Sequence, residues 1–244
     1  MGLFNADYEK EGRGVSKYEK PRNGFVRFFQ TLWQRLFQLV LLNILYLFAC
    51  LPIVTIGPAT AAMNYIVRNY ATGRPVDFWS DFIGKCKEHF KQGIAVFLID
   101  VIVGVVLYFS VNMWSSDMMN LPEVLRVAAL IFCFWVLYIL VCSNLYVFPM
   151  MACFDLPLKK LIKNSVILSM AKLGRNLGMI AIYAVAFLLM WLLFPLSVPL
   201  ALLLSCTALA LATNFIVYPV FEKHIAIPKE ETEDVEEAVF RDNH

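Results

Sequence analysis

Long apolar stretches separated by short polar ones are the main pattern along this chain. Four apolar stretches cover about residues 36–51, 92–114, 124–148 and 177–221, and two prolines interrupt the middle of the last one. A helix that crosses a membrane needs about 20 residues, because each residue rises 1.5 Å and the hydrocarbon core is about 30 Å thick. The last stretch is therefore predicted to form two helices joined by a tight turn. This pattern gives five spans.

The distribution of positive charge changes that count. Of the 21 Lys and Arg residues, 20 fall into four stretches. These stretches lie before residue 36, within 68–91, within 149–175 and after residue 222, and Arg126 is the exception. Cytoplasmic loops carry such an excess of Lys and Arg. Five spans would separate these stretches onto two sides, whereas a sixth, short crossing over 53–70, begun by Pro58, puts all four in the cytoplasm. We therefore predict six spans.

The predicted fold is an all-α, polytopic membrane helical bundle. Its six spans pair into three hairpins, and the second span is short and broken by Pro and Gly. The inner loops 77–91 and 157–175 carry apolar residues at helical spacing, with lysines between them. Each is predicted to form an amphipathic cytoplasmic helix in the headgroup plane, with its basic face toward anionic lipid. The alternative is a coupling helix that docks a cytoplasmic partner.

Composition agrees with a membrane protein. Hydrophobic residues make up 60% and charged residues 16% of the chain, against about 45–50% and about 25% in soluble domains. We expect a polar cytoplasmic N-terminus over 1–24, a transmembrane domain over 25–222 and an acidic cytoplasmic tail over 223–244. The first segment has no apolar core, so no cleavable signal peptide is predicted. We place the protein in the cell membrane, and no feature predicts nucleic-acid binding.

A similar string of residues occurs near the inner end of the second helix of each hairpin. The strings are Met63–Val67, Ser143–Val147 and Thr213–Val217, each with Asn in second place. The second and third continue to an aromatic residue and then Pro, which can end a helix at the water interface. Spacings of 80 and 70 residues between the asparagines match one hairpin and its loop. The strings indicate a triplicated hairpin or, alternatively, three separate asparagines that hydrogen-bond between helices.

Asp100 is the only carboxylate well inside a predicted span. A buried charge there costs several kcal/mol, so Asp100 should be protonated, paired or in contact with water. Its possible partners are Asn43, Asn64, Asn144 and Asn214. These residues predict a proton- or cation-linked polar path through the bundle. The alternative is hydrogen bonding between helices, worth about 0.6 kcal/mol per bond.

Nothing in the sequence predicts an enzyme, a cofactor or a metal site. None of the six cysteines forms a Cys-x-x-Cys pair. No His, Cys, Asp or Glu cluster has the spacing of metal ligands, and no nucleophile has a visible base.

Several motifs are specific enough to compare with known families. They are Leu42–Tyr46, Leu51–Ala62, Arg68–Tyr70, Phe78–Phe82 and Phe90–Gly93, together with Gly2–Asn5 and Val15–Glu19. This combination resembles the YesL family over essentially the whole chain, most specifically over the first hundred residues. That family comprises bacterial multi-pass membrane proteins of unknown function, whose genes often lie beside those of carbohydrate ABC transporters and glycan-degrading enzymes. The resemblance implies a role in sugar uptake and supplies no catalytic residues.

The leading hypothesis is a non-enzymatic membrane accessory or interaction subunit linked to carbohydrate uptake. Its expected partners are the lipid bilayer and subunits of a carbohydrate ABC transporter. Neither inner loop has the Glu-Ala-Ala…Gly coupling motif of ABC permeases, so the chain is not predicted to be the permease. One alternative is a self-sufficient small-solute transporter that uses the polar path. Another is a structural or regulatory membrane protein.

Overall fold

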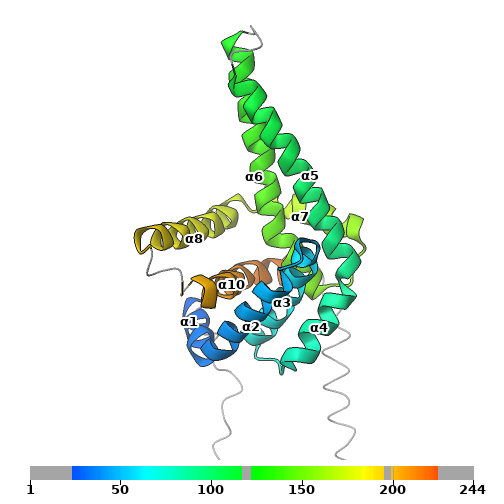
Figure 1. The fold of residues 1–244 in the computed structure, drawn as a ribbon, viewed down its shortest axis with the longest axis vertical. Helices are drawn as coiled ribbons and strands as arrows, with labels where there is room; N and C mark the ends of the chain where they lie inside the picture. The colour runs from blue at the N-terminus through cyan, green and yellow to red at the C-terminus, as the bar shows by residue number, and fades with distance from the viewer. Residues whose placement is uncertain (1–23, 117–121, 195–198, 200, 225–244) are drawn as a thin grey trace, which may run out of the picture.

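The computed structural model describes residues 24–116, 122–194, 199 and 201–224, and these residues form an all-α helical bundle, as predicted (Figure 1). The elements are α1 (Gly24–Gln34), α2 (Leu36–Ala49), η1 (Ile53–Thr55), α3 (Ile56–Thr72), α4 (Phe78–Glu88), α5 (Phe90–Ser115), α6 (Glu123–Cys153), α7 (Leu158–Ala171), α8 (Leu173–Leu192), η3 (Ala201–Ser205) and α10 (Cys206–His224). The predicted acidic tail lies outside the described residues from residue 225 onward, and the predicted polar N-terminus lies outside them up to residue 23.

The α5–α6 hairpin extends well past the other helices (Figure 1). Its helices have 26 and 31 residues, which correspond to about 39 Å and about 46 Å at 1.5 Å per residue. Most of their large apolar side chains face outward, as lipid-facing side chains do. The helix α6 passes through Pro149 and continues to Cys153. Likewise α10 passes through Pro219 and ends at His224.

Within the part of the chain that the structure describes, four helical segments are long and apolar enough to cross a membrane: α5, α6, α8 and Leu203–Phe221. The bent pair of α1 and α2, which meet at 76°, would count as a fifth if it formed one span. This is the pattern of a multi-pass membrane protein. The predicted sixth crossing corresponds to α3, which has 17 residues and is not among these segments. The count of six is therefore not confirmed.

The position of α3 also differs from the prediction. Gly57 near the start of α3 lies against Gly93 near the start of α5, with backbone atoms of the two helices in contact. The six-span arrangement put these two points on opposite sides of about 30 Å of hydrocarbon. Two glycines permit this close approach because neither has a Cβ. The start of α3 therefore lies beside the basic end of the hairpin, next to Lys91, instead of across the bilayer from it.

The order of short and long helices repeats three times along the chain. The three units are α1–α2–α3, α4–α5–α6 and α7–α8–α10, and the short first helix is separated from the second by one residue: Arg35, His89 or Lys172. Each of these residues donates its N–H to the carbonyl four residues earlier, and its own carbonyl accepts from the residue four later. The structure thus gives all three junctions the same backbone hydrogen-bond pattern. The triplication itself stays a prediction.

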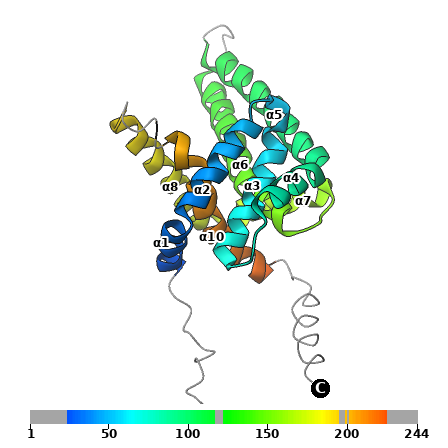
Figure 2. The same cartoon turned by 60° about the horizontal axis from the view of Figure 1, so that its bottom comes forward.

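The two predicted amphipathic helices are present as α4 and α7, and α1 is a third. Figure 2 shows α1 set at an angle to α2, which runs beside α3. In α4, Phe82 is 3% exposed in the core whereas Trp79 is 58% exposed. In α7 the buried face includes Leu161, Ser165 and Leu168, so the predicted apolar stripe is only partly buried. Both helices therefore keep apolar side chains available to lipid or a partner.

The core consists of two clusters that meet around α3 and α10. One cluster joins α6, α7, α8 and α10, with Tyr146 and Phe221 fully buried in it. The other joins α2, α3, α4 and α10 around Leu39 and Ile66. Among the core helices, α3 packs against α2, α4, α5, α6 and α10. The Gly73 backbone, with φ of 76°, ends α3, because Arg74 then donates to the Asn69 carbonyl at 2.9 Å.

Candidate functional site

Four of the five predicted polar residues form two pairs inside the bundle. Asn144 on α6 donates through Nδ2 to Oδ1 of Asp100 on α5 at 2.9 Å. Asn214 on α10 donates through Nδ2 to Oδ1 of Asn64 on α3 at 2.8 Å. The first pair links the two helices of the α5–α6 hairpin, and the second links α3 to α10 across 150 residues of sequence. The structure therefore brings these residues together, and their role in a polar path stays a prediction.

The three asparagines of the repeated strings have the same local geometry. The Nδ2 groups of Asn64, Asn144 and Asn214 donate to the carbonyls of Thr60, Leu140 and Ala210, each four residues earlier, at 2.8, 3.1 and 2.8 Å. Their helices α3, α6 and α10 all pack against one another. The valines that end the strings, Val67, Val147 and Val217, are buried in the core. The three strings thus meet at the centre of the bundle.

Asn43 lies apart from this centre and has a structural role. Its Oδ1 accepts a hydrogen bond from the backbone N–H of Thr207 at 3.2 Å. Thr207 stands in the first turn of α10, just after the π-helical turn η3, where N–H groups lack intrahelical partners. The Thr207 hydroxyl also donates to the Leu39 carbonyl at 3.1 Å. These bonds fasten α2 to the start of α10.

A cavity of about 280 Å³, the central cavity, lies among α2, α3, α6, α8 and α10. Its polar lining consists of Tyr46, Thr60, Asn64, Asn144, Tyr183 and Thr213, together with the Cys206 thiol. Tyr46 and Thr60 lie in hydrogen-bond contact at 3.2 Å, and Tyr183 and Thr213 at 3.1 Å. None of the described residues that line it is charged.

A second cavity of about 170 Å³, the lateral groove, lies among α5, α6 and α7. Asp100, Ser143 and Asn144 supply its polar groups, and the rest of its lining is aliphatic. Asn144 lines both cavities. Its side chain therefore connects the carboxylate of the groove to the amides and hydroxyls of the central cavity.

Sequence reasoning missed a buried network at the junction of α6, α7 and α8. Asn176 is fully buried. Its Oδ1 accepts from the Tyr146 hydroxyl at 2.7 Å, and its Nδ2 donates to the Tyr138 hydroxyl at 3.2 Å and to the Ser169 carbonyl. The available signal in the sequence was Asn176 itself, a polar residue four positions after Lys172. The Thr and Tyr hydroxyls of the central cavity gave no such signal in the sequence, because these residues are common in membrane helices.

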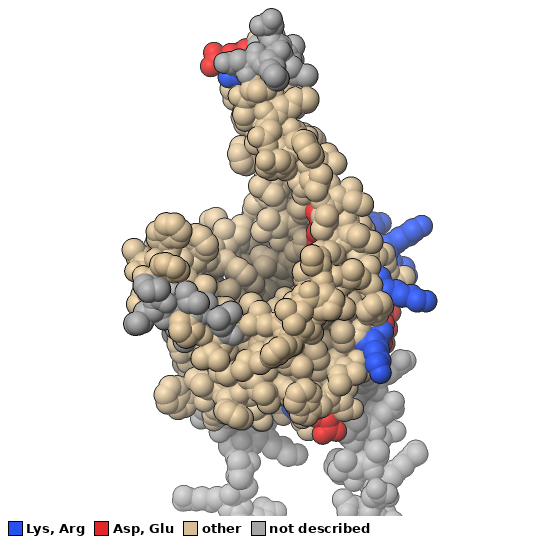
Figure 3. Space-filling model, in the orientation of Figure 1, with Lys and Arg blue, Asp and Glu red and all other residues tan. Residues whose placement is uncertain are grey.

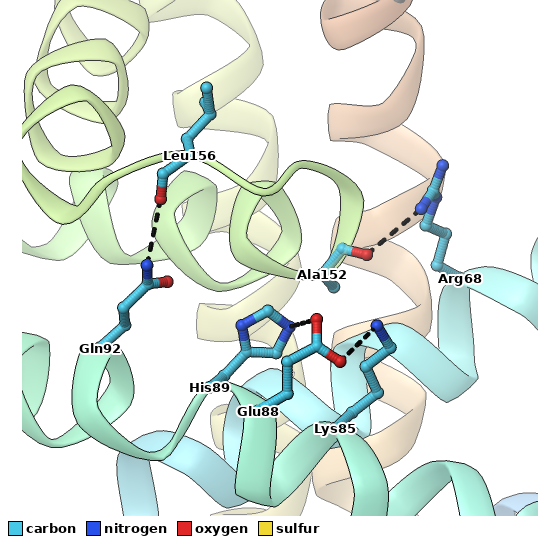
Figure 4. A network of polar contacts seen from close by, with 7 residues as sticks. All are labelled: Arg68, Lys85, Glu88, His89, Gln92, Ala152 and Leu156. Carbon is cyan, nitrogen blue, oxygen red and sulfur yellow. Dashed lines mark hydrogen bonds and ion pairs between the residues drawn. The ribbon is translucent and has the colours of Figure 1, made fainter. Parts of the chain in front are cut away.

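The basic end of the hairpin is tied together by polar contacts to backbone carbonyls, shown in Figure 4. The Arg68 guanidinium at the end of α3 donates to the Ala152 carbonyl at 3.3 Å and lies over the Tyr218 ring. Gln92 on α5 donates to the Leu156 carbonyl at 3.2 Å. These contacts hold α3, α5, α6 and α10 in fixed register.

His89, at the bend between α4 and α5, is buried within this end of the bundle. Its Nε2 lies 3.8 Å from Glu88, which is itself paired with Lys85 at 2.8 Å (Figure 4). Burial lowers the His89 pKa below its ordinary value of 6.5, and Lys85 adds to this effect while Glu88 opposes it. Neutral imidazole is therefore the form that the fold favours.

Among the described residues, no group of three or more His, Cys, Asp or Glu side chains could hold a metal ion. The six cysteines are all free thiols.

Residues 39–111 match the family described as "Protein of unknown function, DUF624". This segment runs from α2 through most of α5 and overlaps the motifs that resemble the YesL family. The chain is also similar to "Uncharacterized protein YteU" of Bacillus subtilis (strain 168), with 31% identity over 156 residues. That alignment covers 61% of this chain and 66% of the relative, so the chain spans slightly less than two thirds of the relative's length. No solved structure matches the chain. Neither match carries a stated activity.

Proposed function

We propose that this chain is a non-enzymatic accessory or interaction subunit of the cell membrane, linked to carbohydrate uptake. The observation that carries the proposal is a basic platform made by α4, α7 and the start of α5. The exposed lysines of this platform on α7 are Lys159, Lys160 and Lys163. The link to carbohydrate rests on the resemblance to the YesL family.

The platform combines charge with rigidity. In Figure 3 most of the visible Lys and Arg side chains gather along one edge at the base of the hairpin, while the hairpin above shows no Lys or Arg below its tip and only a small acidic patch midway. Exposed Trp79 and Ile83 on α4 and Met170 on α7 lie on the same helices as the lysines. A fixed surface with both apolar and basic groups suits a docking site for a protein partner at the headgroup level.

We place both termini and the platform in the cytoplasm, and treat α2 and α3 as a helical pair that enters and leaves the bilayer on that side. This arrangement keeps all basic stretches on one side with four crossings, because α5, α6, α8 and α10 are an even number. It also accounts for the contact between Gly57 and Gly93. Reporter fusions test the orientation: a fusion at Arg74 should report the same side as one near Lys10, and opposite sides would contradict it.

Crosslinking in native membranes, followed by identification of the neighbours, tests the partner. A transporter subunit should be crosslinked by a photoreactive group at exposed Met170 on α7, and this crosslink should be lost when Lys163 is also changed to Glu. Arg126→Glu, at the far end of the hairpin, is the charge-matched control and should leave the crosslink intact. Recovery of lipid alone in every case would refute the accessory role.

A second candidate is a self-sufficient small-solute transporter. It is supported by Asn144, which joins Asp100 in the lateral groove to the central cavity. Flux into proteoliposomes that contain only this chain separates the two candidates. Uptake that depends on Asp100 would favour the transporter, and unchanged uptake in an Asp100→Asn variant would remove its main support.

A further inference from the structure

The hydrogen bonds around the central cavity leave acceptors facing it. The Thr60 hydroxyl donates its proton to the Ile56 carbonyl at 2.7 Å, so the Tyr46 hydroxyl must be the donor in the Tyr46–Thr60 contact. The Thr213 hydroxyl likewise donates to the Leu209 carbonyl at 2.9 Å, so Tyr183 is the donor to Thr213. The Tyr183 oxygen therefore keeps its acceptor lone pairs, and the Tyr46 oxygen keeps acceptor capacity beside its contact with the Cys50 thiol.

Asn144 presents the clearest unused acceptor. Its Nδ2 faces two acceptors, the Asp100 carboxylate and the Leu140 carbonyl, which fixes the orientation of the amide. Its Oδ1 is buried and, among the described residues, is the one buried side-chain polar atom without a protein partner. A buried oxygen left without a donor costs about 1–3 kcal/mol. The atom has almost no accessible surface, so a donor in the cavity removes that cost only after a small turn of the Asn144 side chain toward it.

The cavity also restricts the size and charge of what it can hold. Its volume of about 280 Å³ lies just below the ~300–1,000 Å³ of sites for drug-sized ligands. No charged side chain lines it, and a buried charge without a partner is strongly unfavourable. The aromatic rings of Tyr46, Phe148 and Tyr183 add apolar walls beside the acceptors. Figure 3 shows the surface hollowed between α8 and the hairpin, the elements that carry Tyr183 and Asn144.

We propose that the central cavity is a binding site for a small, uncharged ligand with several hydroxyl groups, which donates hydrogen bonds to the hydroxyl oxygens of Tyr46 and Tyr183 and, after a small turn of the side chain, to Asn144 Oδ1. Such a group can come from a free polyol of one sugar ring or from the hydroxyl head of a neutral lipid that enters from the bilayer. Binding at this site requires no partner protein, so its test is independent of the test of the accessory role.

Cys206 provides a direct readout, because its thiol lines the cavity. The purified full chain in phosphatidylcholine nanodiscs is treated with a small thiol reagent, and modification is followed residue by residue by mass spectrometry. Cys86 on α4, away from the cavity, is the internal control. Glucose tests the free polyol, and dioleoylglycerol in the nanodisc tests the lipid head. Glucosamine and glucuronate, at the same concentration, test the requirement for a neutral ligand.

Glucose or dioleoylglycerol should slow modification of Cys206 and leave Cys86 unchanged, and which of them protects identifies the source. The Tyr46→Phe and Tyr183→Phe changes keep the rings and remove the acceptors. Each should weaken protection by about 2- to 10-fold, the range for one hydrogen bond. Tyr138→Phe, which removes a hydroxyl bonded to Asn176 outside the cavity, should leave protection unchanged.

Protection by neither neutral compound would overturn the proposal, and so would equal protection by the charged analogues. Undiminished protection in the double variant Tyr46→Phe/Tyr183→Phe would overturn the assignment of the acceptors. Each variant is first checked for an unfolding midpoint within a few degrees of the wild type, so that lost protection is not lost fold. Asn144→Ala is a second probe, because it removes the unpaired oxygen without adding bulk.

Discussion

Replacing Gly93 by Ala tests the close contact between α3 and α5. A Cβ at this position would lie 2.5 Å from the Pro58 nitrogen and 2.8 Å from the Gly57 carbonyl carbon. Ordinary contacts of a Cβ begin at about 3.4 Å, so α3 and α5 would have to separate by about 0.9 Å. The obstructing atoms are mostly backbone, which cannot turn aside as a flexible side chain can. Overpacking of this kind costs about 1–3 kcal/mol.

Gly104→Ala is the matched control in the same helix. A Cβ at Gly104 meets nothing within 4 Å, and Ala in a helix interior is favoured over Gly by about 0.5–1 kcal/mol. Unfolding of the purified chain in nanodiscs can be followed with a thiol-reactive dye that reports exposure of the buried cysteines. For a chain of this length each kcal/mol shifts the midpoint by about 2–4 °C.

The Gly93→Ala midpoint should therefore fall below that of the wild type, while the Gly104→Ala midpoint should stay equal or rise. Equal midpoints for the two variants would mean that α3 and α5 do not touch at this point. The positioning of the α2–α3 pair at the basic end of the hairpin would then be wrong, and a full crossing by α3 would again be open.

Three further predictions concern buried polar groups. A double-mutant cycle of Asn64→Ala and Asn214→Ala, followed by unfolding midpoints, should give a coupling energy of about 0.6 kcal/mol and at most about 1.7 kcal/mol; strictly additive effects would mean that the two amides are not bonded. Because burial lowers the His89 pKa below 6.5, the unfolded chain binds more protons below that value, so stability should be present near pH 7.5 and fall toward pH 5.5. The loss should shrink in His89→Gln, and an identical pH profile in both proteins would contradict it. Asn43→Ala should lower the unfolding free energy by about 1–3 kcal/mol because it leaves the Thr207 N–H without its acceptor, whereas Asn43→Ser, which keeps an uncharged acceptor oxygen, should recover part of that loss.

Local patterns predicted most of the helices. The apolar runs that became α5 and α6 and the basic amphipathic stretches that became α4 and α7 each carry their signal in consecutive residues. The predicted stretch 36–51 begins where α2 begins, at Leu36. The short helix α1 before it was not predicted, because the bend at Arg35 has neither Gly nor Pro to mark it and residues 25–35 were assigned to the transmembrane domain without a helix of their own.

The position of α3 depends on a contact that no local pattern contains. Gly57 and Gly93 are 36 residues apart, and either glycine alone predicts only a flexible turn or a weak helix. The polar pairs were partly foreseeable, since Asp100 needed a partner and the asparagines were candidates. Which asparagine reached it was not, because the choice of Asn144 depends on the register of α5 against α6.

At the bends formed by Arg35, His89 and Lys172, the backbone hydrogen bonds continue on both sides, so each short helix is joined directly to the longer helix that follows it. When a short helix in the headgroup plane changes its tilt, the longer helix that follows the bend must therefore move with it. Stretching or thinning of the bilayer would therefore act on all three bends at once. Spin labels on α4 and α7 in nanodiscs of different lipid chain length would record this as a change in their separation.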